Sequence, residues 1–255
     1  MQASIKLNDN PAQQYVLRLA DSCLVLSQRL AEWCGHAPVL EEDIALANMA
    51  LDLLGQARAL LAHAGAAQGF SEDDLAFLRE ERDYRNATLM ELPRGDFAFT
   101  VLRNLVASTW LKLLWERLQQ SNDAELAAIA SKAVKEARYH PQHAADWVVR
   151  LGDGTGESAR RLRSACAALW PYTTELFESD AVDAHAAASG LGPDWGELHA
   201  AWQAELAPVL AEARLEVPAP TPFRSNGKYG RHSEHMGYLL AEMQHLHRSF
   251  PGAVW

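Results

Sequence analysis

Two pairs of side chains spaced three residues apart are the first candidates for chemistry in this sequence. Asp52 precedes Gly55, and Glu136 precedes Tyr139, each pair within a stretch of helical periodicity. A di-iron carboxylate bundle takes a Glu from each of two helices and a Glu-x-x-His pair from each of two others, because residues three apart share one helical face. Here the carboxylates are present and both histidines are missing. The spacing predicts a helical bundle with a degenerate di-iron site at Asp52, Gly55, Glu136, Tyr139 and the adjacent His140.

Other uses of these groups stay open. Asp52 could be a metal ligand, but a buried hydrogen-bond network is favoured, because Gly55 provides no imidazole three residues further on. Glu136 with His140, or His140 with His143, has the spacing of a one-metal site, and a buried polar network is the alternative. The chain has one Glu-x-x-His, at residues 242–245, and so short a motif is weak on its own. We expect no metal to be bound by this chain, because two or three ligands from one helix leave the coordination sphere open.

Composition excludes several classes of protein. With 255 residues, 49% hydrophobic and 22% charged, the chain is long enough and apolar enough to bury a core. A net charge of -10 argues against nucleic-acid binding, which depends on basic surface. The three cysteines form no Cys-x-x-Cys motif, residues 1–10 do not resemble a secretory signal, and we expect no membrane span. A cytoplasmic location is therefore expected.

Apolar periodicity predicts the elements that would position the candidate residues. A first helix from Pro11 to Gly35 should turn one apolar face inward, formed by Val16, Leu19, Cys23, Leu26, Leu30 and Trp33. A second helix ending at Gly65 should bury Ile44, Ala47, Leu51, Leu54 and Leu61. Polar and small residues would border that face: Asn48, Asp52, Gly55 and Gln56. The two helices would form half of a four-helix bundle.

The rest of the chain also has helical periodicity. A short helix capped by Ser71 should run to about Leu92, and the second half of the bundle should span about 96–120 and 122–151, with a kink at Pro141. Further helices are expected at about 158–178, 194–214 and 233–249, with residues 217–222 extended because of their prolines. We therefore predict an all-α fold in one domain, 1–255, with a core bundle over about 11–151 and a C-terminal extension over about 155–255.

Arginines recur at steps of three in the predicted third helix, at Arg79, Arg82 and Arg85, beside Tyr84. One interpretation is a solvated face paired with neighbouring carboxylates. The alternative is a patch that contacts a phosphate-bearing ligand, such as a thioester with a nucleotide tail, because Arg binds phosphate bidentately and stacks on adenine.

Four separated blocks identify a family resemblance over essentially the whole chain. They are LSQRLAEWCGHAP (26–38), LDLLGQAR (51–58), KEARYH (135–140) and LAEMQ (240–244). In this order they closely resemble the PaaC-type subunits of bacterial phenylacetyl-CoA epoxidase. The resemblance implies a ferritin-like fold and a non-catalytic subunit that stabilises a homologous catalytic subunit and helps to form the surface that binds the CoA thioester.

The resemblance also implies where the cofactors lie. The di-iron centre would belong to the catalytic partner, and FAD, an iron–sulfur centre and NADPH to the reductase, with a small accessory subunit in the same complex. Contact with phenylacetyl-CoA is expected at Asp83, Tyr84, Arg85 and Asn86, and more weakly at Arg82 and in a loop around Ala184, His185 and Ala186. The competing classes are a self-sufficient di-iron carboxylate oxidoreductase and an unrelated helical adaptor.

Overall fold

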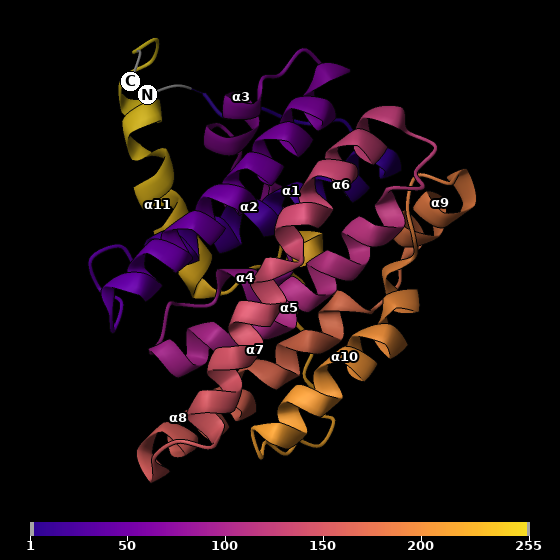
Figure 1. Cartoon of the computed structure of the whole chain (residues 1–255). Coiled ribbons are helices and arrows are strands. Elements are labelled where there is room, and N and C mark those ends of the chain that lie inside the picture. The colour runs from indigo at the N-terminus through magenta and orange to yellow at the C-terminus, as the bar shows by residue number, and fades with distance from the viewer. Residues whose placement is uncertain (1–2, 254–255) are drawn as a thin grey trace.

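Four long helical segments form the centre of the protein (Figure 1), which is described here by a computed structural model of residues 3–253. They are α1 (Pro11–Ala31), α2 (Leu40–Ala66), α5 (Phe97–Leu118), and α6 (Ala124–Ala137) followed by α7 (Tyr139–Gly152). Within the described residues the only β-type pairing is an isolated bridge between Asn226 and Arg231. The predicted all-α four-helix bundle is confirmed.

Helix α1 follows the sequence prediction closely. Asn10 caps its N-terminus by accepting hydrogen bonds from the backbone N–H groups of Ala12 and Gln13, and Pro11 occupies its first position. The predicted inward face is buried throughout: Val16, Leu19, Cys23, Leu26, Leu30 and Trp33. Residues 15–27 are all buried, however, because α2, α4 and α9 also pack against α1. Periodicity predicted one buried face and did not predict that the opposite face is covered as well.

Helix α2 is rotated from the predicted orientation. Leu51 is 64% exposed and Ile44 is 55% exposed, whereas Leu46, Met49 and Leu53 are buried. The prediction was wrong because α2 is apolar on both faces, so its periodicity did not distinguish the inner face from the outer one. The exposed apolar side forms a stripe at Leu40, Ile44 and Leu51, which we call the α2 stripe.

Helix α5 is the core of the bundle. Asp96 caps it, and Trp110 and Trp115 are fully buried. By length and composition, α2 and α5 are both apolar enough to cross a membrane, which the sequence analysis did not anticipate. Two such helices are weak evidence for a membrane span, because the core helix of a folded protein passes the same test. In α5, 78% of the apolar window is buried within the protein. In α2 only 44% of the corresponding window is buried.

The fourth segment of the bundle is divided into two helices near Pro141, where the sequence predicted a kink within one helix. Helix α6 ends at Ala137, and α7 begins at Tyr139, two residues before the proline. Proline at the third position of a helix needs no backbone donor, so the chain starts a new helix there instead of continuing the old one. The break lies between Glu136 and His140, and it sets the angle between them.

Residues 71–92 do not form one helix. Helix α3 (Glu72–Phe77) has the predicted Ser71–Asp74 capping box, but the chain then breaks into η1 (Glu81–Asp83) and α4 (Thr88–Glu91). The reason is tertiary: Arg79 turns inward to form a buried ion pair with Asp21. The three arginines therefore do not share a helical face.

The C-terminal segments pack around the bundle. They are α8 (Gly156–Leu169), η2 (Trp170–Leu176), α9 (Ala181–Ser189), η3 (Trp195–Leu198), α10 (His199–Glu212), η4 (Gly227–Tyr229) and α11 (Glu234–Ser249). Helices α8 and α10 lie against α5, and α9 lies against α1. Helix α11 returns to α3 and α4, on the side of the bundle that also carries α1 and α2 (Figure 1).

The C-terminal region follows the sequence prediction in one segment and departs from it in another. Residues 217–222 contain no helix or strand, as their prolines predicted. Residues 184–186, expected in a loop, lie instead in α9, because Asp180 and Asp183 form a capping box at its start.

Candidate functional site

The paired carboxylates and imidazoles of the bundle meet at the seam between α2 and the α6–α7 break. Asp52 of α2 lies 3.0 Å from His140 of α7, measured from Oδ2 to Nε2. His140 is buried, and burial lowers its pKa below the ordinary value, although the hydrogen bond and charge of the half-buried Asp52 oppose this. The histidine is therefore held neutral and oriented by the carboxylate.

A second pair lies one helical turn further along α2. The Gln56 side chain donates a hydrogen bond from Nε2 to Oε2 of Glu136, at 3.1 Å, and its carbonyl faces the Cys23 thiol of α1 at 3.9 Å. Burial raises the pKa of the Cys23 thiol well above its usual range, so it stays protonated. The Gln56 side chain thus links the Glu136 carboxylate of α6 to Cys23 of α1.

A third pair lies towards the start of α2. Glu42 Oε2 is 2.9 Å from His143 Nε2, and both side chains are nearly buried. The Tyr139 ring lies beside this pair, with its centroid 5.7 Å from that of His143. Glu42 was not anticipated, since its position in the first turn of α2 suggested only an acidic residue near a helix N-terminus.

Gly55 and Tyr139 lie on the surface of the bundle. A Cβ added at Gly55 would meet no atom within 4 Å, and Tyr139 is 54% exposed. Histidines at these positions would lie on the surface of the bundle and not in its buried interior. The inward positions are the next residues along each helix, Gln56 and His140.

These donors do not fit a di-iron centre. Among residues 3–253 there is no group of three or more His, Cys, Asp or Glu side chains placed to hold a metal ion. Each candidate ligand instead satisfies another: Asp52 with His140, Glu136 with Gln56, and Glu42 with His143. A di-iron site needs about four carboxylates converging with two imidazoles. The seam is arranged as three separate hydrogen-bonded pairs.

Beside these pairs, a groove of about 390 Å³ lies between α2 and α6 and is open to solvent. Asp52, Gly55 and Gln56 line one side, and Lys132 and Glu136 line the other. Three of the five predicted degenerate positions, Asp52, Gly55 and Glu136, therefore border a surface groove, and Tyr139 and His140 are not among the residues that line it.

Two of the residues predicted to contact the CoA thioester are internal. Tyr84 and Asn86 are fully buried. The Tyr84 hydroxyl donates to the backbone carbonyl of Ala76, and Asn86 donates from Nδ2 to Oε2 of Glu91 at 2.8 Å. Glu91 is also bound by His232, 2.6 Å away. Both predicted residues have their side chains committed to the core.

The remaining predicted contact residues lie in separate places, and all of them except Ala186 are more accessible than Tyr84 and Asn86. Arg82 is exposed and lines a pocket together with Glu80, Glu81 and Gly230. Asp83 and Arg85 are half-buried, and Arg85 donates from Nε to the side-chain carbonyl of Gln14. On α9, Ala184 and His185 are exposed and Ala186 is buried.

The fold and the seam together define a class: a ferritin-like helical bundle whose carboxylates and imidazoles are paired with one another. The comparisons with known proteins agree. The whole chain, residues 1–255, matches the model of the family described as phenylacetic acid catabolic protein, and the chain belongs to this family. It is 49% identical over 247 residues to the C-type subunit of the 1,2-phenylacetyl-CoA epoxidase of Escherichia coli (strain K12), covering 96% of this chain and 100% of that relative. The resemblance carried by the four sequence blocks is thus confirmed.

Proposed function

We propose that this chain is a non-catalytic structural subunit of a multicomponent di-iron monooxygenase that epoxidises the aromatic ring of phenylacetyl-CoA. In this proposal the di-iron centre lies in a homologous catalytic subunit. A small accessory subunit and a reductase with FAD, an iron–sulfur centre and NADPH complete the complex in the cytoplasm. The name of the Escherichia coli relative, an epoxidase subunit, supports the assignment to such a complex.

One observation carries the non-catalytic role. The polar groups of the seam are used up in pairs: Asp52 with His140 at 3.0 Å, Gln56 with Glu136 at 3.1 Å and Glu42 with His143 at 2.9 Å. Glu42 is the nearly buried carboxylate of the three, and an unpaired charge there would cost on the order of 3–5 kcal/mol. Asp52 and Glu136 are half-buried, so their pairing mainly fixes their orientation. The pairs therefore serve as a structural substitute for metal ligation.

The α2 stripe is the surface that we assign to the catalytic partner. Leu40 is 72% exposed, Ile44 55% and Leu51 64%, and the exposed Gly55 and Ala59 continue the same face. An apolar row of this length on a helix is unusual for a free surface and typical of a protein interface. Because the small residues allow close approach, a helix of the partner can pack along α2.

Iron content and activity test the proposal directly. The chain alone, the catalytic homologue alone and their mixture are each assayed with the reductase for iron per chain and for epoxidation of phenylacetyl-CoA. We expect iron in the homologue and in the mixture, and full activity only when this chain is present. Stoichiometric iron with turnover by the isolated chain would establish the alternative, a self-sufficient di-iron oxidoreductase. An unrelated helical adaptor would leave epoxidation independent of this chain.

A surface variant tests the assigned interface. Leu51→Glu places a charge in the centre of the α2 stripe, and Leu246→Glu makes the same change at a 54% exposed leucine of α11. We expect Leu51→Glu to weaken association with the catalytic homologue by at least about tenfold, since a buried unpaired charge costs more than about 1.4 kcal/mol. Leu246→Glu should bind normally. Equal binding by both variants, measured by calorimetry, would move the interface elsewhere.

The CoA-binding surface belongs to the same proposal. Of the predicted residues, the exposed Arg82 is the best placed to contact a phosphate, while the buried Tyr84 and Asn86 would support the backbone around it. Two neighbouring carboxylates, Glu80 and Glu81, line the same pocket and oppose an anion there. Arg82 would supply the positive charge that offsets these carboxylates. Replacing Arg82 by Ala should therefore raise the KM of the assembled enzyme for phenylacetyl-CoA without changing its iron content.

A further inference from the structure

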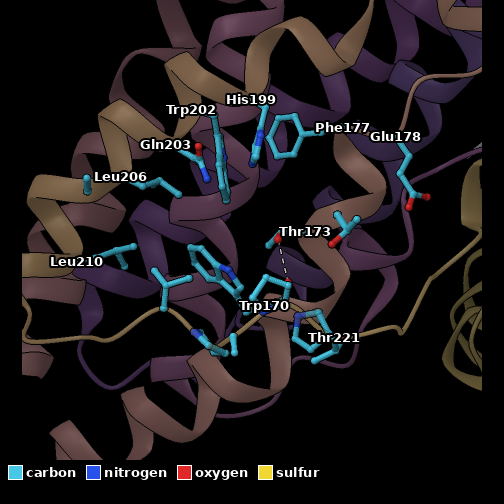
Figure 2. Close-up of a pocket in the computed structure, with 17 residues that line it drawn as sticks. Trp170, Thr173, Phe177, Glu178, His199, Trp202, Gln203, Leu206, Leu210 and Thr221 are labelled. Atoms are coloured by element: carbon cyan, nitrogen blue, oxygen red, sulfur yellow. Dashed lines mark hydrogen bonds between the residues drawn. The ribbon is translucent and has the colours of Figure 1, made fainter.

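A pocket of about 580 Å³ lies on the C-terminal half of the protein, away from the α2–α6 seam (Figure 2). One wall is η2, the opposite wall is α10, and residues 217–221 pass across its mouth. Its size is in the ordinary range for small-molecule sites, roughly 300–1,000 Å³. The proposed scaffold function makes no use of it.

Aromatic side chains form the body of the pocket. Trp170 and Trp202 lie 5.6 Å apart between ring centroids, and Phe177 lies 5.0 Å from Trp202. His199 extends this cluster, 4.7 Å from Phe177, and Figure 2 shows its ring beside that of Phe177 at one end of the pocket. Such a cluster offers ring faces and edges to another flat ring, which prefers offset or edge-on contacts.

The rest of the lining is aliphatic or uncharged. Leu206 and Leu210 continue the α10 wall, and Pro218 and Pro220 line the pocket from the 217–221 segment. Gln203 and Thr174 provide neutral hydrogen-bonding groups among the lining residues. The chemistry of the pocket is therefore apolar with a few neutral polar atoms.

Charge separates the possible ligands. The described residues that line the pocket include no Lys or Arg, so an anionic group would enter without a cationic partner. The one carboxylate among them, Glu178, is already paired with Arg224, whose Nε lies 2.6 Å from its Oε1. A cationic ligand would have to compete with that arginine. His199 is the remaining titratable group of the lining, and an ion that does not pair with its imidazole would lose hydration without gaining a free counter-ion.

Residues 217–221, which cross the mouth of the pocket, are held by contacts of the residues that precede and follow them. Phe223 lies edge-on to Tyr172, with 5.0 Å between centroids, and Arg224 donates to the carbonyls of Thr221 and Phe223. The backbone before the prolines is fixed at Leu215, whose N–H donates to the carbonyl of Leu210. Because the proline N atoms cannot donate, the segment can move without breaking a ladder of backbone hydrogen bonds.

From these observations we propose that the pocket between η2 and α10 binds an uncharged, planar aromatic molecule of about two fused rings. The ring system would lie against Trp170, Trp202 and Phe177, and a neutral polar substituent would bond to Gln203 or Thr174. This site is distinct from any contact with the nucleotide end of a CoA thioester, whose phosphates the lining does not match.

Three ligands of one shape test the proposal: 2-naphthamide, 2-naphthoate and 2-naphthamidine, which are neutral, anionic and cationic at pH 7. Calorimetry and tryptophan emission are measured with the full-length protein. We expect 2-naphthamide to bind at least about tenfold more tightly than either ion, because burying an unpaired charge costs more than about 1.4 kcal/mol. Equal or tighter binding of either ion, or no binding by any of the three, would overturn the proposal.

Variants on α10 place the binding within the pocket. Ala207 is an exposed lining residue, and Ala204 is exposed on the same helix outside the lining, so Ala207→Phe and Ala204→Phe make the same change inside and outside the pocket. We expect Ala207→Phe to reduce 2-naphthamide affinity at least about tenfold and Ala204→Phe to leave it unchanged. Gln203→Phe, a second exposed lining position, should reproduce the loss. Retained affinity in both lining variants would refute the assignment.

Discussion

Two buried histidines respond to the protein interior in opposite ways because their partners differ. Burial lowers the pKa of His140, and the half-buried Asp52 does not offset it. Burial also acts to lower the pKa of His232, but the hydrogen bond and charge of Glu91, which is fully buried, outweigh it, so the pKa of His232 is raised. His140 therefore disfavours folding in acid, whereas His232 favours the folded state when protonated.

His232→Gln tests this at the residue scale. The native pKa of His232 lies above its ordinary value of 6.5, so the folded protein keeps a proton that the unfolded chain releases. The resulting stability is complete below pH 6.5 and is lost as the pH rises through the native pKa. We expect the free energy of unfolding of the native protein to fall relative to that of the variant as the pH rises from 6.5 through the native pKa of His232. In urea titrations at a series of pH values, the control variant His185→Gln, at an exposed histidine, should show the same pH dependence of the free energy of unfolding as the native protein. The same pH dependence in His232→Gln would refute the coupling of His232 to Glu91.

Part of the site was predictable from residue types, and part was not. The sequence singled out Asp52, Glu136 and His140, and the structure places each of them in a hydrogen-bonded pair, as expected for polar side chains that border an apolar helical face. It did not identify Gln56 as the partner of Glu136, because the orientation of α2 was misjudged. A helix with apolar residues all round gives no periodic signal for its inner face.

At the scale of elements, local caps were predictable and tertiary breaks were not. Pro11, the Ser71–Asp74 box and Pro141 each mark the helix boundary that the structure contains. The division of residues 71–92 depends on Asp21, some sixty positions away in the sequence, which pairs with Arg79 and accepts from the backbone N–H of Arg85. No local pattern carries that information.

Gly227 illustrates how closely two such elements fit. Its N–H donates to Thr88 Oγ1 at 3.0 Å, and a Cβ at this position would clash with the backbone oxygen of Asn86. Gly227→Ala should therefore separate η4 from α4 and lower the free energy of unfolding by about 1–3 kcal/mol, the usual cost of overpacking. Gly156→Ala is the matched control, since a Cβ there meets nothing within 4 Å and alanine suits the start of α8. Equal stability of the two variants in urea would contradict the close fit.

At the scale of the whole molecule, the C-terminal region is tied to the first half of the chain by specific polar contacts. The Tyr15 hydroxyl donates to the carbonyl of Pro193, and Arg248 donates from Nε to the carbonyl of Phe77. Trp202 donates from its indole to the carbonyl of Val106 in α5. The fold class and family were predictable because the motif blocks span the chain, but these long-range ties were not.

These ties lead to a prediction about cooperativity. If residues 1–255 form one domain, as the sequence analysis predicted, tryptophan emission and far-ultraviolet circular dichroism should report the same urea midpoint. The eight tryptophans occur in both the bundle and the C-terminal extension, so emission samples both regions. Two separate transitions, with the emission of the extension changing first, would divide the chain near residue 155.

The α2 stripe has a consequence for the life of the protein in the cell. A newly made copy that has not met the proposed catalytic partner displays Leu40, Ile44 and Leu51 to solvent. Chaperones and quality-control proteases act on exposed apolar segments, and an unassembled copy would also self-associate through them. The amount of this subunit would then be set by the supply of its partner, with surplus chains degraded as orphans.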